Sequence, residues 1–135
     1  MIVDLSKENK IEFRNDLSSN YWFGILQINE ITHEFSFDNN ENLDWQQIKD
    51  RLVYFVKHHA KIINLTSLGI DHYIKFTLGW ESKIKYDLEC VTILVNDPKE
   101  NIFKIHPISF DDPYVSWSAH IYDNEGPKLR NVTRE

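Results

Sequence analysis

Two histidines and one glutamate are the residues of this sequence whose types and expected positions best suit chemistry. His106 and His120 lie in the segments 102–110 and 114–122, which a turn of three residues separates. If these segments pair in antiparallel fashion, the two imidazoles lie diagonally adjacent, with Glu89 near His106. Two imidazoles and a carboxylate can hold a metal ion or transfer protons. Because their spacing is no established ligand motif, the competing interpretation is a set of polar residues on a solvated part of a sheet.

The other residues with reactive side chains have structural interpretations. His58 and His59 are neighbours on a predicted helix, where successive side chains point about 100° apart and cannot bind one metal ion together. Cys90 is the only cysteine, which excludes an internal disulfide, and we expect an inert thiol that faces the core. Asp111 and Asp112 stand in a turn with too few oxygen ligands for calcium or magnesium. We therefore expect no metal centre.

Glycine-rich and nucleophile motifs are absent from the sequence. The four glycines are isolated from one another, so no loop is suited to cradle a phosphate group. There is no Gly-x-Ser-x-Gly, no His-Glu-x-x-His and no Cys-x-x-Cys. We therefore expect no cofactor, and an enzyme is the less favoured class.

A helix that begins after Asp44 is the clearest element in the sequence. Aspartate is a favourable N-cap, and Leu43 and Ile48 fall at the two positions of a hydrophobic staple. Apolar and boundary residues then recur at helical spacing: Trp45, Ile48, Leu52, Phe55, Val56, His59, Ile62 and Ile63. We predict that this single long amphipathic helix ends near Asn64.

Alternating apolar residues and β-branched runs predict an antiparallel sheet of about six strands. The predicted strands are 21–28, 31–37, 72–80, 86–95, 102–110 and 114–122. Short connections require antiparallel neighbours, so the fold class is α+β in the order ββ-α-ββββ. Pro107 cannot donate to a ladder, which predicts an edge strand or a bulge at that point. The chain after Asp123 is expected to fray.

The expected pairing divides the side chains of the last three strands between two faces. The face that the helix should cover has Leu88, Cys90, Leu94, Phe103, Ile105, Trp117, Ala119 and Ile121. The second face has the apolar residues Val91, Ile93, Val95, Ile102, Ile108 and Phe110, and the polar residues Glu89, Lys104, His106, Ser118, His120 and Tyr122. Large bare apolar patches are rare on monomers, so we expect this second face to pack on the N-terminal segment or on another molecule. A homodimer is one such arrangement.

Composition and charge narrow the classes of partner and the location. The chain of 135 residues fits a single domain, 1–135, and its formal net charge is −6. An acidic surface disfavours nucleic acid, which requires a basic surface, and attracts a basic protein partner. The N-terminus lacks the basic start and apolar run of a signal peptide, and no apolar run has the roughly 20 residues of a membrane span. We expect a cytoplasmic protein without membrane contact, and the abundance of Ile, Lys and Asn indicates a bacterial genome rich in AT.

Two short patterns in the first half of the chain resemble those of small acidic bacterial proteins. Residues 22–25 read Trp-Phe-Gly-Ile in a strand that begins a hairpin, and residues 44–45 read Asp-Trp at the start of the helix. With its acidity and helix-plus-sheet order, the chain is similar to immunity proteins from toxin–immunity loci and to acidic bacterial domains of unknown function. The resemblance brings across no functional residue. It implies a protein that binds and neutralises a toxin domain.

Three functional hypotheses follow from these observations. The first is a non-catalytic intracellular binding protein, an immunity protein that neutralises a basic toxin partner. Its candidate contacts are surface carboxylates and one aromatic residue: Glu34, Asp38, Glu41, Asp111, Asp112, Tyr114 and Asp123. The second is a small hydrolase or metal-dependent enzyme that uses Glu89, His106 and His120. The third is a homo-oligomeric structural protein that associates through the second sheet face.

Overall fold

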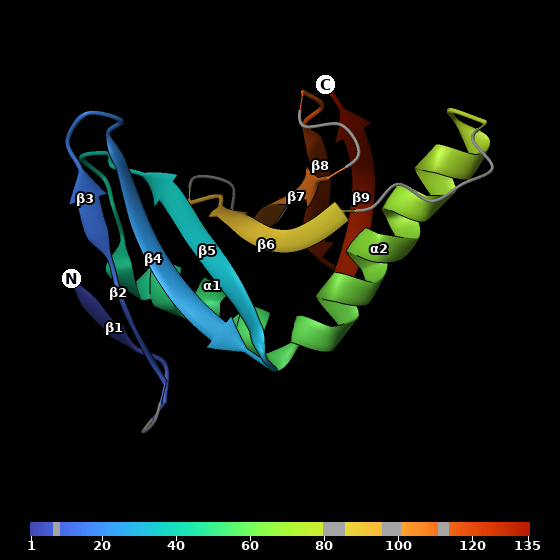
Figure 1. Cartoon of the computed structure of the whole chain (residues 1–135). Helices are drawn as coiled ribbons and strands as arrows, with labels where there is room; N and C mark the ends of the chain where they lie inside the picture. Colours follow the sequence, from blue (N-terminus) through green and yellow to red (C-terminus); the bar gives the residue numbers. More distant parts are fainter. Residues whose placement is uncertain (7–8, 80–85, 96–100, 111–113) are drawn as a thin grey trace.

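Over the residues that the structure describes, the fold is α+β, with one large sheet, a small separate sheet and two helices (Figure 1). The computed structural model describes residues 1–6, 9–79, 86–95, 101–110 and 114–135. The strands are β1 (Ile2–Asp4), β2 (Lys10–Glu12), β3 (Arg14–Asp16), β4 (Tyr21–Ile28), β5 (Ile31–Asp38), β6 (Tyr86–Ile93), β7 (Phe103–Ser109), β8 (Trp117–Asp123) and β9 (Pro127–Arg134). β1 pairs with β2, and β3 to β9 form a seven-stranded sheet in sequence order. The α+β class is confirmed, whereas the predicted order ββ-α-ββββ has too few strands and one helix too few.

β5 and β6 are the parallel pair in the described sheet, and all its other neighbours are antiparallel. Three residue pairs join them, from Glu34 opposite Cys90 to Ser36 opposite Thr92. Both helices lie between β5 and β6 in the chain. This long connection carries the chain back to the end of the sheet where β5 begins, so β6 runs in the same direction as β5. The expectation of antiparallel neighbours throughout is wrong here because the connection is long.

Helix α1 (Trp45–Lys57) begins where the sequence predicts a helix. The Asp44 carboxylate accepts hydrogen bonds from two backbone N–H groups of the first turn, at 3.0 and 3.3 Å. The helix ends at His58, whose φ of −107° and ψ of 19° interrupt the helical path, and α2 (His59–Phe76) follows at once. The prediction of one helix that ends near Asn64 is therefore wrong.

Helix α2 occupies most of the segment 72–80, for which the sequence predicts a strand. Its buried residues recur at helical spacing: His59, Ile62, Thr66, Ile70 and Ile74. Ile70 and Ile74 pack with Trp117 in a second, small cluster of buried residues. A short alternation of apolar residues fits the end of a helix as well as a strand, and the strand prediction is wrong. Trp80 lies outside the described residues.

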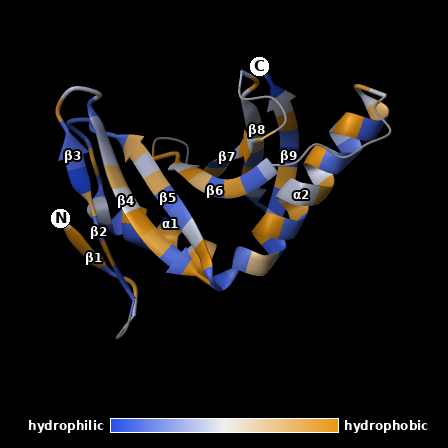
Figure 2. Ribbon diagram, viewed as in Figure 1, coloured by the Kyte–Doolittle hydropathy of each residue, from blue (hydrophilic) through white to orange (hydrophobic). Residues whose placement is uncertain are grey.

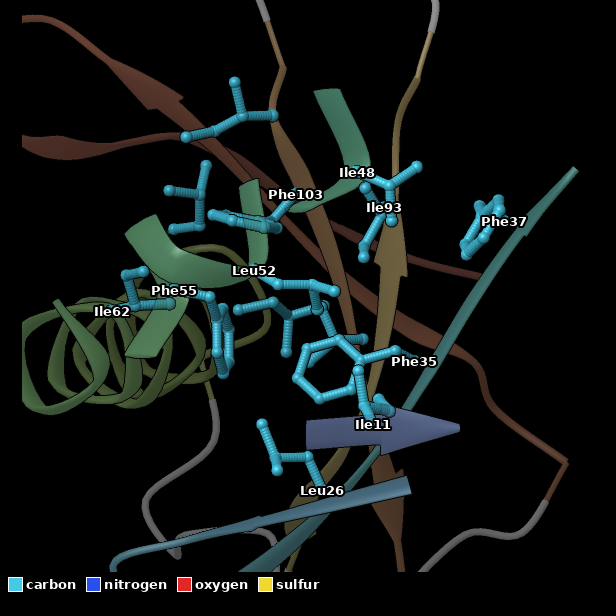
Figure 3. Close-up of a cluster of buried hydrophobic side chains, with 14 of the residues drawn as sticks. Ile11, Leu26, Phe35, Phe37, Ile48, Leu52, Phe55, Ile62, Ile93 and Phe103 are labelled. Atoms are coloured by element: carbon cyan, nitrogen blue, oxygen red, sulfur yellow. The ribbon is translucent and has the colours of Figure 1, made fainter. Parts of the chain in front are cut away.

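The small sheet and both helices cover the same face of the seven-stranded sheet. Gly24 of β4 lies beneath Phe13, whose ring a Cβ at position 24 would approach to 2.8 Å. Phe55 of α1 packs edge-on against Phe35 of β5, with ring centroids 5.3 Å apart. Helix α2 lies along β8 and β9 (Figure 1). Figure 3 shows the core that these elements enclose against the sheet.

The pairing of β6 with β7 differs by one residue from the expected pairing. Val91 lies opposite Ile105, so the buried side of β6 carries residues that were expected on the second face. A β-bulge between Asp87 and Cys90 interrupts the pairing nearer the start of β6. Cys90 lies opposite His106, so it points away from the helices and not into the core as predicted. The pairing of β7 with β8 is as predicted, with Ile105 opposite Ala119.

We call the side of the seven-stranded sheet away from the helices the open face. On β6, β7 and β8 its residues include Cys90, Thr92, Lys104, His106, Ser118, His120 and Tyr122, together with the exposed Ile108. The one-residue shift places Val91 and Ile93 on the covered face, where both are buried, so the open face is less apolar than predicted. Because Ile108 and Phe110 stay exposed, the homodimer hypothesis remains a prediction, with a smaller apolar surface to support it.

Strand β7 confirms one smaller prediction and β9 corrects another. Pro107 lies in an interior strand, and the bulge that was the alternative to an edge is found opposite it, between Asp87 and Cys90 of β6. The residues after Asp123 do not fray but form β9, which pairs along β8. Two backbone hydrogen bonds between Ser116 and Glu135, at 2.6 and 2.8 Å, hold the end of this strand.

Candidate functional site

Strand β5 shows how the sheet separates a buried side from a polar one. Its buried residues are His33, Phe35 and Phe37. The residues between and after them point to the open face: Glu34, Ser36 and Asp38. Figure 2 shows the resulting alternation of hydrophobic and hydrophilic residues along this strand. The candidate functional residues are therefore those that the pleat directs away from the helices.

Three carboxylates gather around Cys90, which points to the open face. Glu34 of β5 lies directly across from Cys90, and Asp87 lies opposite Ile108 on the same face; Glu89 is exposed at the β-bulge between them. Repulsion from Asp87 raises the pKa of Glu89 above its usual value, and loss of solvent acts in the same direction. Burial raises the pKa of the Cys90 thiol, and the three carboxylates raise it further. We call Glu34, Asp87 and Glu89 the acidic patch.

The acidic patch has no counter-charge in the described part of the chain. None of its carboxylates forms an ion pair with a described lysine, arginine or histidine. The thiol beside them is a poor nucleophile, since a raised pKa keeps it protonated at neutral pH. The arrangement therefore suits the binding of a cation better than catalysis by the cysteine.

A hollow of about 670 Å³ opens on the same face, toward the carboxyl ends of β5 and β6. Its lining consists of Ser19, Tyr21, Phe23, Ser36, Asp38, Asn40, Thr92, Ile93, Leu94, Val95, Lys104 and His106. Tyr21 and Phe23 of β4 form one wall, with ring centroids 6.2 Å apart. Asp38 lies directly opposite Tyr21 on β5, while Lys104 and His106 belong to β7. The hollow has the size of a pocket for a small ligand or a large side chain.

His106 and His120 lie near each other on the open face, as the sequence predicts. His120 faces Lys104 across the β7–β8 pair, which places it diagonal to His106. His106 Nδ1 lies 3.1 Å from Ser118 Oγ. Burial, and after it the charge of Lys104, lowers the pKa of both imidazoles. Both rings are therefore predominantly neutral at neutral pH.

Glu89 has different neighbours from the two histidines with which the sequence grouped it. Glu89 interacts with Asp87 and Cys90, whereas the titratable neighbours that affect His106 are Lys104 and His120. Among the described residues, no three His, Cys, Asp or Glu side chains are grouped so as to hold a metal ion. The residues suggested for a hydrolase or metal site therefore separate into a histidine pair and one member of the acidic patch.

The residues expected to contact a partner lie on several surfaces. Glu34 belongs to the acidic patch and Asp38 to the hollow, so two of them share the open face. Glu41 is exposed in the loop between β5 and α1, and Tyr114 is exposed ahead of β8. The expected contacts at 111–112 lie outside the described residues.

Asp123 has a structural role at the end of β8. Its carboxylate accepts a hydrogen bond from Tyr54 Oη at 2.8 Å and one from the backbone N–H of Gly126 at 3.0 Å. Burial, and after it the hydrogen bond to Asp123, raises the pKa of the Tyr54 hydroxyl. Asp123 therefore ties α1 to the β8–β9 turn, and a partner would have to compete with these bonds.

A buried pair of histidines, which the sequence did not connect, joins β5 to the start of α2. His33 Nε2 and His59 Nε2 lie 2.7 Å apart, and both residues are buried. His59 Nδ1 is 3.3 Å from the side-chain amide of Asn29. Burial, and after it the neighbouring imidazole, lowers the pKa of His33 to about 4, and burial lowers that of His59. The position of His59 on the apolar stripe of the helix predicts that it is a core residue. His33 alternates with Phe35 in its strand, and this pattern indicates that His33 also faces the core.

No protein-family model, curated protein or solved structure matches the chain. In the part of the chain that the structure describes, no helix combines the length and the apolarity needed to cross a membrane. The resemblance to immunity proteins therefore stays a prediction. The chemistry of the open face is the feature from which a function can be inferred.

Proposed function

We propose that this chain is a non-catalytic binding protein of the bacterial cytoplasm that receives a basic protein partner on the open face of its sheet. The observation that carries the proposal is the acidic patch. Glu34 and Asp87 lie on the side of the sheet away from the helices, the exposed Glu89 interacts with Asp87, and no described cation pairs with any of the three. Positive side chains of a partner would supply the missing counter-charge.

The acidic patch works against the stability of the free protein. Repulsion between Asp87 and Glu89 raises the pKa of Glu89, which means that the ionised carboxylate is less favourable in the folded chain than in water. Such repulsion between carboxylates occurs at binding surfaces, because the positive charges of a bound partner remove it. The repulsion therefore supports a role in binding over a role in folding.

Neutralisation of a toxin is the biological role that we propose for this binding. An immunity protein has to cover a basic surface of its toxin and requires no catalytic group of its own. The formal net charge of −6 would attract such a partner at long range, and the acidic patch would pair with it at short range. Glu34 is the one residue among the expected contacts that belongs to this patch.

The test compares two double variants that each remove two negative charges. Glu34→Gln with Glu89→Gln neutralises most of the acidic patch. The matched control, Asp4→Asn with Glu12→Gln, changes exposed positions of the small sheet, on the other side of the molecule. The probe is the purified product of the gene adjacent to the one that encodes this chain, titrated into each protein by calorimetry.

We expect the wild type and the control to bind this product equally, and the patch variant to bind it at least about tenfold more weakly. The wild type should also restore growth to cells that express the adjacent gene, while the patch variant should not. Unchanged affinity of the patch variant contradicts binding at the acidic patch. An adjacent gene product that neither binds the wild type nor impairs growth contradicts the immunity role.

A further inference from the structure

We propose that the hollow is a pocket for one arginine side chain of the partner. The guanidinium would stack against Tyr21 and Phe23 and pair with the Asp38 carboxylate. This inference deepens the proposed function and rests on it, because the arginine belongs to the basic partner inferred above. It assigns the hollow to a specific contact, separate from the acidic patch.

The register of β4 and β5 brings the aromatic wall and the carboxylate together. Tyr21 lies directly opposite Asp38, and Phe23 lies directly opposite Ser36. Residues opposite each other on one face of an antiparallel pair have Cβ atoms about 5 Å apart. The two rings are 6.2 Å apart with their planes inclined at 56°, so they form an angled wall and not a flat stack. A planar group that lies on this wall has the Asp38 carboxylate at its edge.

Arginine fits this combination better than the other basic side chain. Its guanidinium is planar, stacks on aromatic faces and offers parallel N–H groups to a carboxylate. The lysine ammonium is a compact, strongly hydrated charge, so it stacks less well on the rings and pairs less well with the carboxylate. A volume of about 670 Å³ accommodates the side chain together with part of the flanking backbone.

Asp38 is available for such a pair in the described part of the chain. It is exposed, and no described residue forms a hydrogen bond or an ion pair with its carboxylate. Lys104, which also lines the hollow, lies two strands away on β7 and forms no ion pair with Asp38.

Hydrogen bonds among asparagines hold the rim of the hollow in place. Asn20, with a φ of 60°, and Asn39 are joined by a backbone hydrogen bond of 3.0 Å and by a bond of 3.2 Å from the Asn20 side-chain amide to the Asn39 carbonyl. Trp22 Nε1 donates to the Asn39 side chain at 3.2 Å. These residues fix the β3–β4 turn beside the end of β5, next to Tyr21 and Asp38. A pocket whose rim is already ordered loses little entropy when it binds.

The test uses N-acetyl-arginine amide as the probe, added to the full chain labelled with ¹⁵N and followed by NMR. The lysine analogue keeps the charge without the planar group, and the citrulline analogue keeps the shape without the charge. We expect the arginine probe to shift the amide signals of Tyr21, Phe23 and Asp38. The dissociation constant should be about fivefold higher for the lysine analogue and at least about tenfold higher for the citrulline analogue.

Three variants test the hollow. Asp38→Asn should weaken binding of the arginine probe about tenfold and Tyr21→Leu about threefold, whereas Asp4→Asn, an exposed position of the small sheet, should leave it unchanged. A wild-type spectrum apart from local shifts confirms that each variant is folded. The proposal is overturned if the citrulline analogue binds as tightly as the arginine probe, or if folded Asp38→Asn binds the arginine probe as tightly as the wild type does. It is also overturned if N-acetyl-aspartate amide binds more tightly than the arginine probe, because the hollow would then bind an anion through Lys104. If the arginine probe binds in the hollow but the variant Glu34→Gln/Glu89→Gln binds the partner as tightly as the wild type does, the proposed function is overturned and the arginine pocket is not.

Discussion

The hydrogen bond between His33 and His59 makes the stability of this protein dependent on pH. One imidazole has to donate its N–H and the other has to accept it, so the 2.7 Å bond requires at least one neutral ring. The pair is enclosed by Phe35 and Phe55, with the Asn29 amide on the far nitrogen of His59. A proton added to this pair is therefore poorly solvated, and the double protonation of acid solution breaks the bond.

The size of the effect follows from the pKa of His33. It is about 4 in the folded chain against 6.5 for an unperturbed histidine, even though Asp87 and the Leu88 backbone favour the charged form. This difference corresponds to roughly 3 kcal/mol of folding free energy. Because the folded pKa lies below the unfolded one, the unfolded chain binds more protons between these values. The stabilisation is complete above about pH 6.5 and is lost as the pH falls to about 4.

The double variant His33→Leu/His59→Leu provides the comparison. It removes both titrating groups and fills their places with apolar side chains, which avoids leaving one buried polar partner alone. The free energy of unfolding is measured by urea denaturation of both proteins from about pH 7.5 to about pH 4. The carboxylates titrate in both proteins, so the difference between the two curves isolates the histidine pair. We expect this difference to change by about 3 kcal/mol in favour of the variant, and parallel curves would refute the reasoning.

Three other predictions concern the open face and the packing behind it. Glu89→Gln should raise the melting temperature of the free protein at neutral pH, and a lower melting temperature would argue against repulsion in the acidic patch. Cys90 should react with Ellman's reagent more slowly than free cysteine, and the double variant Glu34→Gln/Glu89→Gln should react faster; an unchanged rate would contradict the electrostatic effect on the thiol. Gly24→Ala places a methyl group 2.8 Å from the Phe13 ring, so urea denaturation should show a loss of about 1–3 kcal/mol, and a loss within about 0.5 kcal/mol would mean that the ring moves aside freely.

The elements that could be predicted are those whose sequence signals lie within a few neighbouring residues. The start of α1 follows from the Asp44 cap and the apolar spacing after it, and both signals lie within one turn. The β4–β5 hairpin follows from a run of aromatic and β-branched residues and an alternating run after it, joined by Asn29 and Glu30, which adopt φ values of 50° and 68°. In contrast, the segment 72–76 became helical because Ile70 and Ile74 reach the buried Trp117, a residue far along the chain.

The register of β6 shows why the two faces could not be assigned from the sequence. Both sides of this strand carry apolar residues, so the alternation that normally identifies the buried face was missing. The pairing of Val91 with Ile105 and of Ile93 with Phe103 then decided which set was buried, and a change of one residue in this pairing exchanges the two sets. The consequence for function is that Cys90 and Thr92, and not Val91 and Ile93, lie on the open face.

The candidate site was predictable residue by residue but not as a group. Glu34, Asp38 and Glu89 were each recognised as available carboxylates in the sequence. The grouping of Glu34 with Glu89 depends on the parallel pairing of β5 with β6, and two helices separate these strands in the chain. Long-range pairings of this kind depend on the whole fold, so local sequence signals do not reveal them.

The polar nature of the open face determines how a partner should bind. An apolar interface gains its affinity from burial and depends little on salt, whereas charge pairing accelerates association and is screened by ions. The acidic patch and the formal net charge of −6 therefore predict that the association rate constant with a basic partner falls by about tenfold between about 50 and 500 mM NaCl. The dissociation rate constant should change much less, because the contacts of the hollow are partly shielded from salt. Surface plasmon resonance with the partner immobilised measures both constants, and an association rate that is independent of salt would mean that the acidic patch does not guide binding.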